Sequence, residues 1–258
     1  MGTLYIDTGG SATNSGSTDQ NAANLSGSNA TVSGSVVTLD GSPDLSALVT
    51  SGDTQSSIHI SQATNSNMKI FWITAFDNTA KTVTVHAAPT GVTGSAWAIG
   101  GRHVLTNASI EGALRAGDTA IFNNSPTSST SSLWTFRNAG DTTSGFAKIK
   151  GKTGVRPVLT KTTNGDVITG NSIGGVWIEN FELVSQGASG YCISGTLGAN
   201  TVIYNNKCTD SGSGGILTGS ASGVKIIGNE ISGSAGNAID MSSSQSAVVF
   251  GNYLHDCG

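Results

Sequence analysis

Apolar residues recur in adjacent pairs at a fixed distance before an asparagine in the last third of the chain. The four segments that carry this pattern are Val176–Asn180, Val202–Asn206, Lys225–Asn229 and Val248–Asn252. Their asparagines follow one another at intervals of 26, 23 and 23, and the residues three and two positions before each asparagine are apolar in every copy. Short β-branched runs bounded by Gly, Ser and Asn are typical of strands. Each segment therefore predicts a strand that ends at an asparagine corner.

A second apolar run follows each of the first three asparagines. These runs are Tyr191–Ser194, Gly215–Thr218 and Asn237–Asp240, and their central isoleucines recur at the same interval of 23. Two short strands per repeat, at a period near 23, exclude helical repeats, and the leucine scaffold of leucine-rich repeats is absent. We predict an all-β fold in which a parallel β-solenoid stacks its coils at about 4.8 Å. The additional three residues of the first interval are expected in the turn 186–190.

The repeated asparagines have a physical role in this arrangement. Asparagine tolerates unusual φ angles at a sharp corner, and its amide bonds to neighbouring backbone. Stacked in register, such amides form a ladder from coil to coil. We predict a buried ladder of Asn180, Asn206, Asn229 and Asn252.

The remainder of the chain is less regular and predicts two domains. Residues 1–100 are expected to form a β-rich attachment or oligomerisation region, with a hairpin around residues 77–80. The polar stretch over residues 14–29 is expected to be a long surface loop, or a segment that is disordered until a partner orders it. Residues 101–258 are expected to form the solenoid, which could be the start of a longer one. A short helical turn over residues 109–118 is expected near its beginning.

Composition and charge narrow the function. Gly, Ser, Thr and Asn together make up 123 of 258 residues, charged residues make up 11%, and the net charge is −4. A nucleic-acid binder would normally be basic, so the negative net charge argues against that function. No apolar run is long enough to span a membrane. The first residues lack the features of a secretory signal peptide. Three cysteines without paired spacing, and four scattered histidines, predict neither disulfides nor a metal or cofactor.

The repeat resembles the right-handed parallel β-helix, or pectate-lyase-like, family. The resemblance rests on the motif apolar-apolar-x-Asn, a Gly-rich turn and an Ile-centred strand, and it covers residues 165–258. The stretch from the hairpin through Trp97–Gly101 is similar to the N-terminal part of phage and prophage β-helix proteins. The family includes lyases, hydrolases, phage tailspikes and inert virion proteins, so the resemblance implies a fold and leaves the function open. It also implies a homo-oligomer, commonly a trimer.

Candidate chemistry in the repeat is sparse. Lyases of this family need clustered acidic calcium ligands, and hydrolases need two carboxylates at a set separation. Only Asp210 and Asp256 share a phase, and they lie two coils apart. The one cluster of charge is basic and comprises Lys148, Lys150, Lys152 and Arg156. It is a candidate contact face for an acidic glycan or subunit, or a solvated outer face.

We therefore expect a non-enzymatic structural component of a tailed-phage virion: a capsid decoration, head-fibre, tail-fibre or spike-shaft protein. Such a protein is assembled in the host cytoplasm and contacts other virion subunits, and a cell-surface glycan is a further candidate partner. The alternatives are a glycan-degrading β-helix enzyme, such as a tailspike depolymerase or polysaccharide lyase, and a bacterial surface adhesin. The last coil is expected to expose Phe250 and Leu254, because it stops before its second predicted strand.

Overall fold

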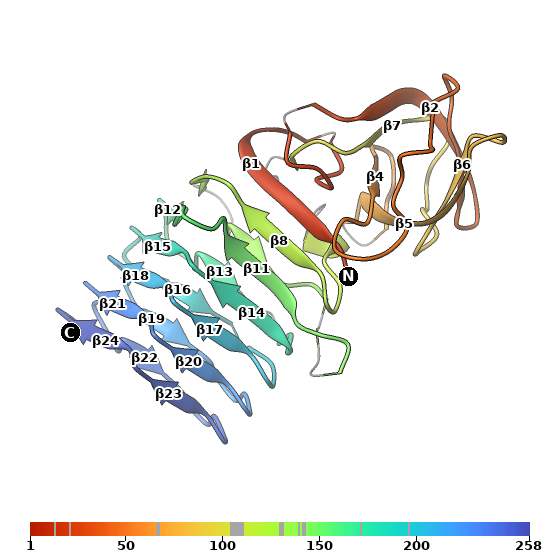
Figure 1. Cartoon of the computed structure of the whole chain (residues 1–258). Helices are drawn as coiled ribbons and strands as arrows, with labels where there is room; N and C mark the ends of the chain where they lie inside the picture. The colour runs from red at the N-terminus through yellow and green to blue at the C-terminus, as the bar shows by residue number, and fades with distance from the viewer. Residues whose placement is uncertain are drawn as a thin grey trace. The chain divides into compact units, whose positions relative to one another are not determined.

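The computed structural model shows an all-β chain that divides into two compact units (Figure 1). Unit 1 comprises Met1–Leu114 with Asp118–Ala120, and unit 2 comprises Arg115–Gly117 with Ile121–Gly258. The sequence-based boundary between residues 100 and 101 lies inside unit 1. The structure describes residues 1–12, 14–20, 22–65, 68–103, 111–128, 132–138, 140, 143–170, 172–195 and 197–258.

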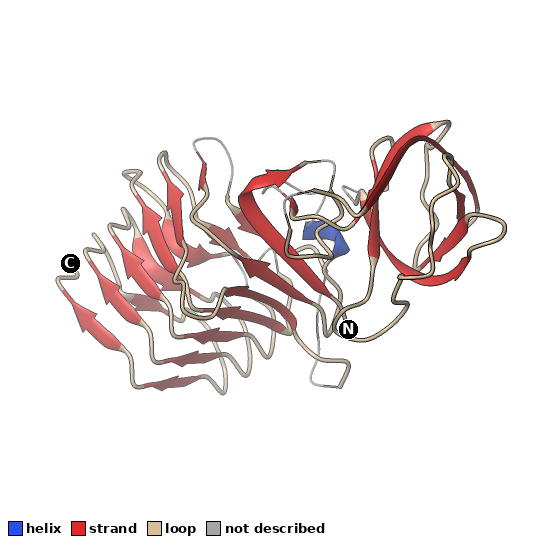
Figure 2. Ribbon diagram, turned by 45° about the horizontal axis from the view of Figure 1, so that its top comes forward, coloured by secondary structure: helices blue, strands red, loops and turns tan. Residues whose placement is uncertain are grey.

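Unit 1 is built around a closed barrel of six antiparallel strands. Around the barrel, the order is β2 (Leu25–Ser33), β3 (Val36–Thr38), β6 (Thr82–Val85), β5 (Ile70–Asp77), β4 (Ser57–Ile60) and β7 (Ser95–Ile99). Figure 2 shows these strands curling round a common interior. Because β7 pairs with β2, with Leu25 opposite Ile99, no strand edge is left open.

Alternating side chains of these strands form the barrel core. Its buried aromatic and aliphatic residues include Phe71, Ile73, Val83, Trp97 and Ile99. The predicted hairpin joins β5 to β6. Asp77 Oδ1 accepts hydrogen bonds from the backbone N–H groups of Thr79 (2.8 Å) and Ala80 (2.9 Å), which fixes this turn.

The polar stretch over residues 14–29 differs from the predicted surface loop. β2 begins at Leu25, and Asn14, Ser15 and Ser17 are buried. The hydroxyl of Ser15 accepts a hydrogen bond from Gly100 N (2.7 Å), so polar residues are buried here by mutual bonding. Unit 1 also contains β1 (Thr3–Ser11) and a 3₁₀ turn, η2 (Glu111–Ala113). Ser109 and Ile110 of the predicted helical turn lie outside the described residues.

Unit 2 is a parallel β-solenoid of about five turns. Three sheets run along it, each taking one strand from successive coils (Figure 1). The first sheet contains β8 (Thr119–Phe122), β11 (Ala147–Gly151), β14 (Val176–Glu179), β17 (Val202–Tyr204), β20 (Lys225–Ile227) and β23 (Val248–Phe250). The second contains β10 (Trp134–Thr135), β13 (Ile168–Thr169), β16 (Tyr191–Ser194), β19 (Gly214–Leu217) and β22 (Ile239–Asp240). The third contains β9 (Thr127–Ser128), β12 (Val158–Lys161), β15 (Glu182–Ser185), β18 (Lys207–Thr209), β21 (Glu230–Ser232) and β24 (Tyr253–His255).

Each regular coil thus has three strands, where two were predicted. The missed strand belongs to the third sheet and is only three or four residues long. It starts shortly after the first-sheet strand ends, as β18 does after β17. Such a short run carries one inward apolar residue, for example Cys208 or Ile231, and so gives no alternating pattern.

The coil length changes along the solenoid. On the third sheet, Leu183 pairs with Cys208, and Cys208 pairs with Ile231, so the second interval is shorter than the first by two. The second sheet already has the shorter interval between Tyr191 and Gly214. The additional two residues therefore lie in the turn between β15 and β16.

Inward residues of each coil stack on those of the next. Ile178, Ile203 and Ile226 are aligned in register and are fully buried. Burying one such side chain contributes about 1.5–3 kcal/mol. In the last coil the inward positions Val249 and Leu254 are 43% and 47% exposed, and Phe250 is 72% exposed. Burial in this unit therefore depends on the adjacent coil.

Candidate functional site

Three asparagines form a hydrogen-bonded ladder at the corner between the first and third sheets. Asn229 Oδ1 accepts hydrogen bonds from the backbone N of Asn206 (2.9 Å) and from its Nδ2 (3.2 Å). Asn252 Oδ1 accepts the same two bonds from Asn229, at 2.9 and 3.0 Å. The amide nitrogens also donate across the corner, as Asn229 Nδ2 does to the Ile203 carbonyl (3.0 Å). Asn206 and Asn229 are each 1% exposed, so buried amides here bond to one another and to backbone.

Asn180 does not belong to this ladder, which corrects the sequence-based alignment. The register pairs Glu179 with Tyr204, so Asn180 is equivalent to Asn205, and Phe181 occupies the position of Asn206. Asn180 has φ 63° and Asn205 φ 53°, the left-handed conformation that asparagine tolerates. The side chain of Asn180 donates to the Val155 carbonyl (3.0 Å). The interval from Asn180 to Asn206 was therefore longer by one than the structural repeat.

The four basic residues lie in two places. Lys148 and Lys150 project from the outer face of β11, because Ala147 and Ile149 face inward. Lys148 forms an ion pair with Glu179 on β14, and its Nζ lies 4.5 Å from the centre of the Trp177 ring. Arg156 lies after the strand and donates to Asn205 Oδ1 (2.9 Å). Lys152 follows the end of β11 at Gly151.

Sequence reasoning missed an aromatic row on the outer face of the first sheet. The Phe146 and Trp177 rings lie 5.5 Å apart, and the Trp177 and Tyr204 rings 6.4 Å apart, both edge to face. The signal was present in the repeat itself. Adjacent residues of a strand face opposite sides of the sheet, so an apolar pair must place one of its members outside.

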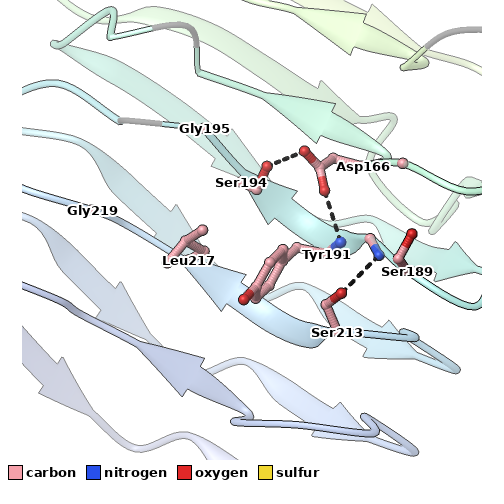
Figure 3. A pocket seen from close by; sticks show the side chains of 10 residues that line it. Asp166, Ser189, Tyr191, Ser194, Gly195, Ser213, Leu217 and Gly219 are labelled. Atoms are coloured by element: carbon pink, nitrogen blue, oxygen red, sulfur yellow. Dashed lines mark hydrogen bonds between the residues drawn. The ribbon is translucent and has the colours of Figure 1, made fainter.

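A polar pocket lies on the outer face of the second sheet, over β16 and β19 (Figure 3). Its volume is about 470 Å³. Asp166 Oδ1 accepts a hydrogen bond from Tyr191 N (2.8 Å), and Asp166 Oδ2 accepts one from the Ser194 hydroxyl. Ser213 Oγ accepts a hydrogen bond from Gly190 N (3.0 Å). A side chain at Gly214 would collide with the Tyr191 ring, at 2.7 Å from its Cβ, so glycine is needed beneath the tyrosine.

The pocket offers hydrogen bonds to a polar ligand. Asp166 is the one carboxylate among its described lining residues, and both of its oxygens are already bonded to groups of the adjacent coil. Glycosidic hydrolysis with a paired acid and base requires two carboxylates roughly 5–9.5 Å apart across the bond. The described lining thus provides recognition groups without that pair.

Among the other described acidic residues of the solenoid, Asp210 and Asp256 lie at corners, and Glu179 and Glu230 lie in ion pairs. Asp210 and Asp256, which share a phase, occupy the same corner in two coils, with φ angles of 54° and 53°. Gly233 occupies this corner in the coil between them, with φ 65°. On the third sheet, Glu230 lies 3.8 Å from Lys207 Nζ and 3.6 Å from His255 Nε2. A hydrogen bond to Asp256 raises the pKa of His255. These carboxylates accordingly serve turns and surface pairing.

The described residues hold no cluster of three or more His, Cys, Asp or Glu side chains suited to a metal. Cys192 and Cys208 are buried free thiols, and Cys257 is a partly exposed one. Hydrogen bonding with Cys192, and then burial, raise the pKa of Cys208. Within the same part of the chain, no helix is long and apolar enough to cross a bilayer.

Comparison with known proteins identifies the repeat. Residues 159–258 match the family described as the right handed beta helix region. The solenoid is a right-handed parallel β-helix. The match starts at Leu159 in β12 and covers the coils in which the regular repeat was recognised. No curated protein and no solved structure matches the chain.

Proposed function

We propose that this chain is a non-enzymatic structural component of a tailed-phage virion. The observation that carries the proposal is that polar groups of the β-helix bond to one another from coil to coil. Asn206 and Asn229 are buried and fully engaged in the ladder, and both oxygens of Asp166 are bonded to residues of the next coil. Groups satisfied in this way make a coil rigid and leave few free for chemistry.

The division of the chain into two units supports a separate role for each unit. A closed barrel has no open strand edge to pair with other chains and presents loops as contact points. Unit 1 would attach to neighbouring virion subunits, and the β-helix would serve as a shaft or decoration. A homotrimer, as the resemblance implies, is part of the proposal, as is assembly in the host cytoplasm.

The first experiment tests whether the chain is a component of purified virus particles. Particles purified from the native source should contain this chain at a fixed copy number, measured by quantitative mass spectrometry after density-gradient purification. Gold-labelled antibodies against unit 1 loops should decorate one site on the particle surface or remain excluded by a subunit contact there. Absence of the chain from washed particles would contradict the proposal.

A second experiment separates this proposal from a glycan-degrading enzyme. The full chain is incubated with acidic and neutral polysaccharides, and reducing ends and unsaturated products are measured. We expect neither to appear. Cleavage that is lost in Asp166→Asn but kept in Asp210→Asn would instead identify the second-sheet pocket as an active site.

A further inference from the structure

Two cysteines from neighbouring coils face each other inside the β-helix. Cys192 lies in β16 and Cys208 in β18, and both side chains are fully buried. The Cys192 thiol donates to the Leu183 carbonyl (3.2 Å), and its sulfur lies 3.9 Å from the Thr209 carbonyl oxygen. Leu183 is the register partner of Cys208 in the third sheet. The Cys192 sulfur therefore lies against the two strands that carry Cys208 and its partner.

The next coil shows how closely these two positions approach. In register, Gly215 lies over Cys192, and Ile231 lies over Cys208. A Cβ atom added at Gly215 would lie 2.5 Å from Ile231 Cγ2. Since Cγ2 is one bond of about 1.5 Å from its own Cβ, the two Cβ positions are no more than about 4 Å apart. Disulfide-bonded residues have Cβ atoms about 3.5–4.5 Å apart, so the backbone at this pair of positions suits a disulfide.

The ionisation of the thiols agrees with this contact. Hydrogen bonding with Cys192 is the first cause that raises the pKa of Cys208, and burial is the second. The thiolate is the reactive form of a cysteine, and a thiol buried in apolar surroundings supplies little of it at neutral pH. Closed coils therefore protect the pair from oxidants. A bond between the two sulfurs has to form while the coils are open, during folding or in a transient local opening.

We propose that Cys192 and Cys208 form a reversible disulfide that clamps two successive coils of the β-helix. In an oxidising medium, the thiolate of one cysteine attacks a sulfur of a small disulfide, such as oxidised glutathione, and releases one molecule of the reduced thiol. The thiolate of the other cysteine then attacks the protein sulfur of the mixed disulfide and releases the second molecule. The two cysteines together lose two protons and two electrons, and the small disulfide gains them.

This bond joins coils that are otherwise held by hydrogen bonds and packing alone. It closes a loop of the chain that contains β17, and a disulfide stabilises mainly by constraining the unfolded chain. In a reducing cytoplasm the pair stays as two thiols. The stability of the β-helix thus depends on the redox conditions under which its coils close. The spacing of the cysteines along the sequence does not indicate this bond, because the partners meet only through the register of the coils.

The inference does not rest on the virion proposal, because a disulfide inside the β-helix is compatible with any role of the chain. Particle composition tests the virion proposal, whereas the state of the thiols in the isolated protein tests this one. Failure of either leaves the other in place.

The test uses the full chain in glutathione buffers that range from fully reducing to fully oxidising. The protein is unfolded in urea, refolded in each buffer, alkylated under denaturing conditions and digested with trypsin, which separates the two cysteines by cleavage after Lys207. Mass spectrometry should find the peptides of Cys192 and Cys208 joined in oxidising buffers, with a mass two hydrogen atoms below their sum. In reducing buffers they should be separate. Oxidation is also followed on folded protein at increasing urea concentration, so the test does not depend on complete refolding.

Two further measurements distinguish a native cross-link from an accidental one. Folded, reduced protein moved into oxidising buffer without urea should form the bond at least about tenfold more slowly than refolding protein does, because the closed coils exclude glutathione. The cross-linked protein should melt about 5 °C above the reduced protein.

The third cysteine and the neighbouring coil provide the controls. Cys257 is partly exposed, so it should be alkylated before the buried pair, and Cys257→Ser should leave the yield of the cross-link unchanged. Cys192→Gly combined with Cys208→Ile repeats the residues of the next coil. This variant should fold and melt at the same temperature in reducing and oxidising buffers.

Three results would overturn the proposal. The first is that no bond between Cys192 and Cys208 appears even in the most oxidising buffer. The second is that Cys257 pairs with either cysteine in preference to the buried pair. The third is that the cross-linked protein melts below the reduced protein, which would show that the bond distorts the coils.

Discussion

The barrel and the β-helix solve the same problem, the pairing of strand edges, in opposite ways. The barrel closes on itself, so its order depends on partners far apart in sequence, such as Leu25 with Ile99. In the β-helix, each coil is ordered by the coil that follows it in the chain, as Ile203 is by Ile226. Stability in the barrel is therefore cooperative and fixed in extent, whereas in the β-helix it is approximately a sum over neighbouring coils.

Buried polar groups sharpen this comparison. In the β-helix, Asn206 and Asn229 are buried with their amides bonded along the ladder. In the barrel, His59 is 4% exposed, and its Nδ1 has no hydrogen-bond partner among the described residues. The buried amides of Asn206 and Asn229 are stabilised by their hydrogen bonds. Burial of His59 instead disfavours the protonated, charged form of its imidazole.

The largest effect is expected when the ladder is broken at Asn229. Asn229→Leu keeps the approximate volume but removes the acceptor of the buried Asn206 backbone N–H and the side-chain donor to the Ile203 carbonyl, while Asn206 Nδ2 keeps only its bond to the Ile178 carbonyl. A buried group left unpaired costs about 1–3 kcal/mol, so the β-helix should lose about 3 kcal/mol or more. Hydrogen exchange read peptide by peptide should show faster exchange in the adjacent coils, with the barrel unchanged.

Asn237→Leu provides the control, because it makes the same chemical change at an exposed turn. Its effect should stay within about 0.5 kcal/mol. Equal losses for the two variants would show that the ladder has no special role in stability.

Acid should affect the barrel before the β-helix. Burial, and then the charges of His103 and Lys69, lower the pKa of His59 from 6.5 to about 3. The unfolded state therefore binds more protons between these values, so stability is lost as the pH falls below 6.5. The slope is about 1.4 kcal/mol per pH unit. Barrel peptides should lose exchange protection between about pH 6.5 and 4, and His59→Leu should flatten this dependence.

His255 in the last coil should respond with the opposite sign. Its pKa is raised by Asp256, so its contribution is present below pH 6.5 and is lost as the pH rises through the raised value. Loss of protection in the barrel and the β-helix at the same acidic pH, unaltered by His59→Leu, would refute the assignment to His59.

The smallest effects are expected at left-handed corners. Asp210 (φ 54°) occupies the corner that Gly233 occupies one coil later, and Lys81 (φ 54°) occupies such a position in the barrel hairpin. Asp210→Gly and Lys81→Gly should change stability by no more than about 0.5 kcal/mol, since glycine adopts this φ freely. Asp210→Val should lose about 1–2 kcal/mol, because a β-branched residue is strained there. Thermal melts of the three variants decide the matter.

The repeat could be predicted because one physical constraint recurs at a fixed phase. An inward isoleucine such as Ile216 must lie over Ile193, and this requirement makes apolar residues recur at a fixed interval along the sequence. The short strand Lys207–Thr209 has no such periodic signature, and a single misplaced residue moved Asn180 into the ladder. Barrel closure was not predictable for a related reason. Leu25 and Ile99 lie in two segments that are far apart in the sequence, and the residue pattern of either segment does not indicate which strand it pairs with.

The candidate sites were harder to predict than the fold. Lys148 was recognised as part of a basic run, yet its neighbours Trp177 and Glu179 come from the next coil. Asp166 meets Ser194 in the same way, across the interval of one coil. Outward residues are free of the packing constraint that makes the core periodic, so only the register of the coils reveals which of them meet.

The uniform step between Asn206, Asn229 and Asn252 also bears on how this chain can evolve in length. Positions separated by that step are paired in register, as Ile203 is with Ile226 and Ile226 is with Val249. Recombination between the gene segments that encode them would therefore add or remove one whole coil and keep the backbone register at the junction. An indel of an odd number of residues within a strand would instead shift inward residues to the outside. The β-helix is thus free to vary in length by whole coils, while the barrel admits no such unit.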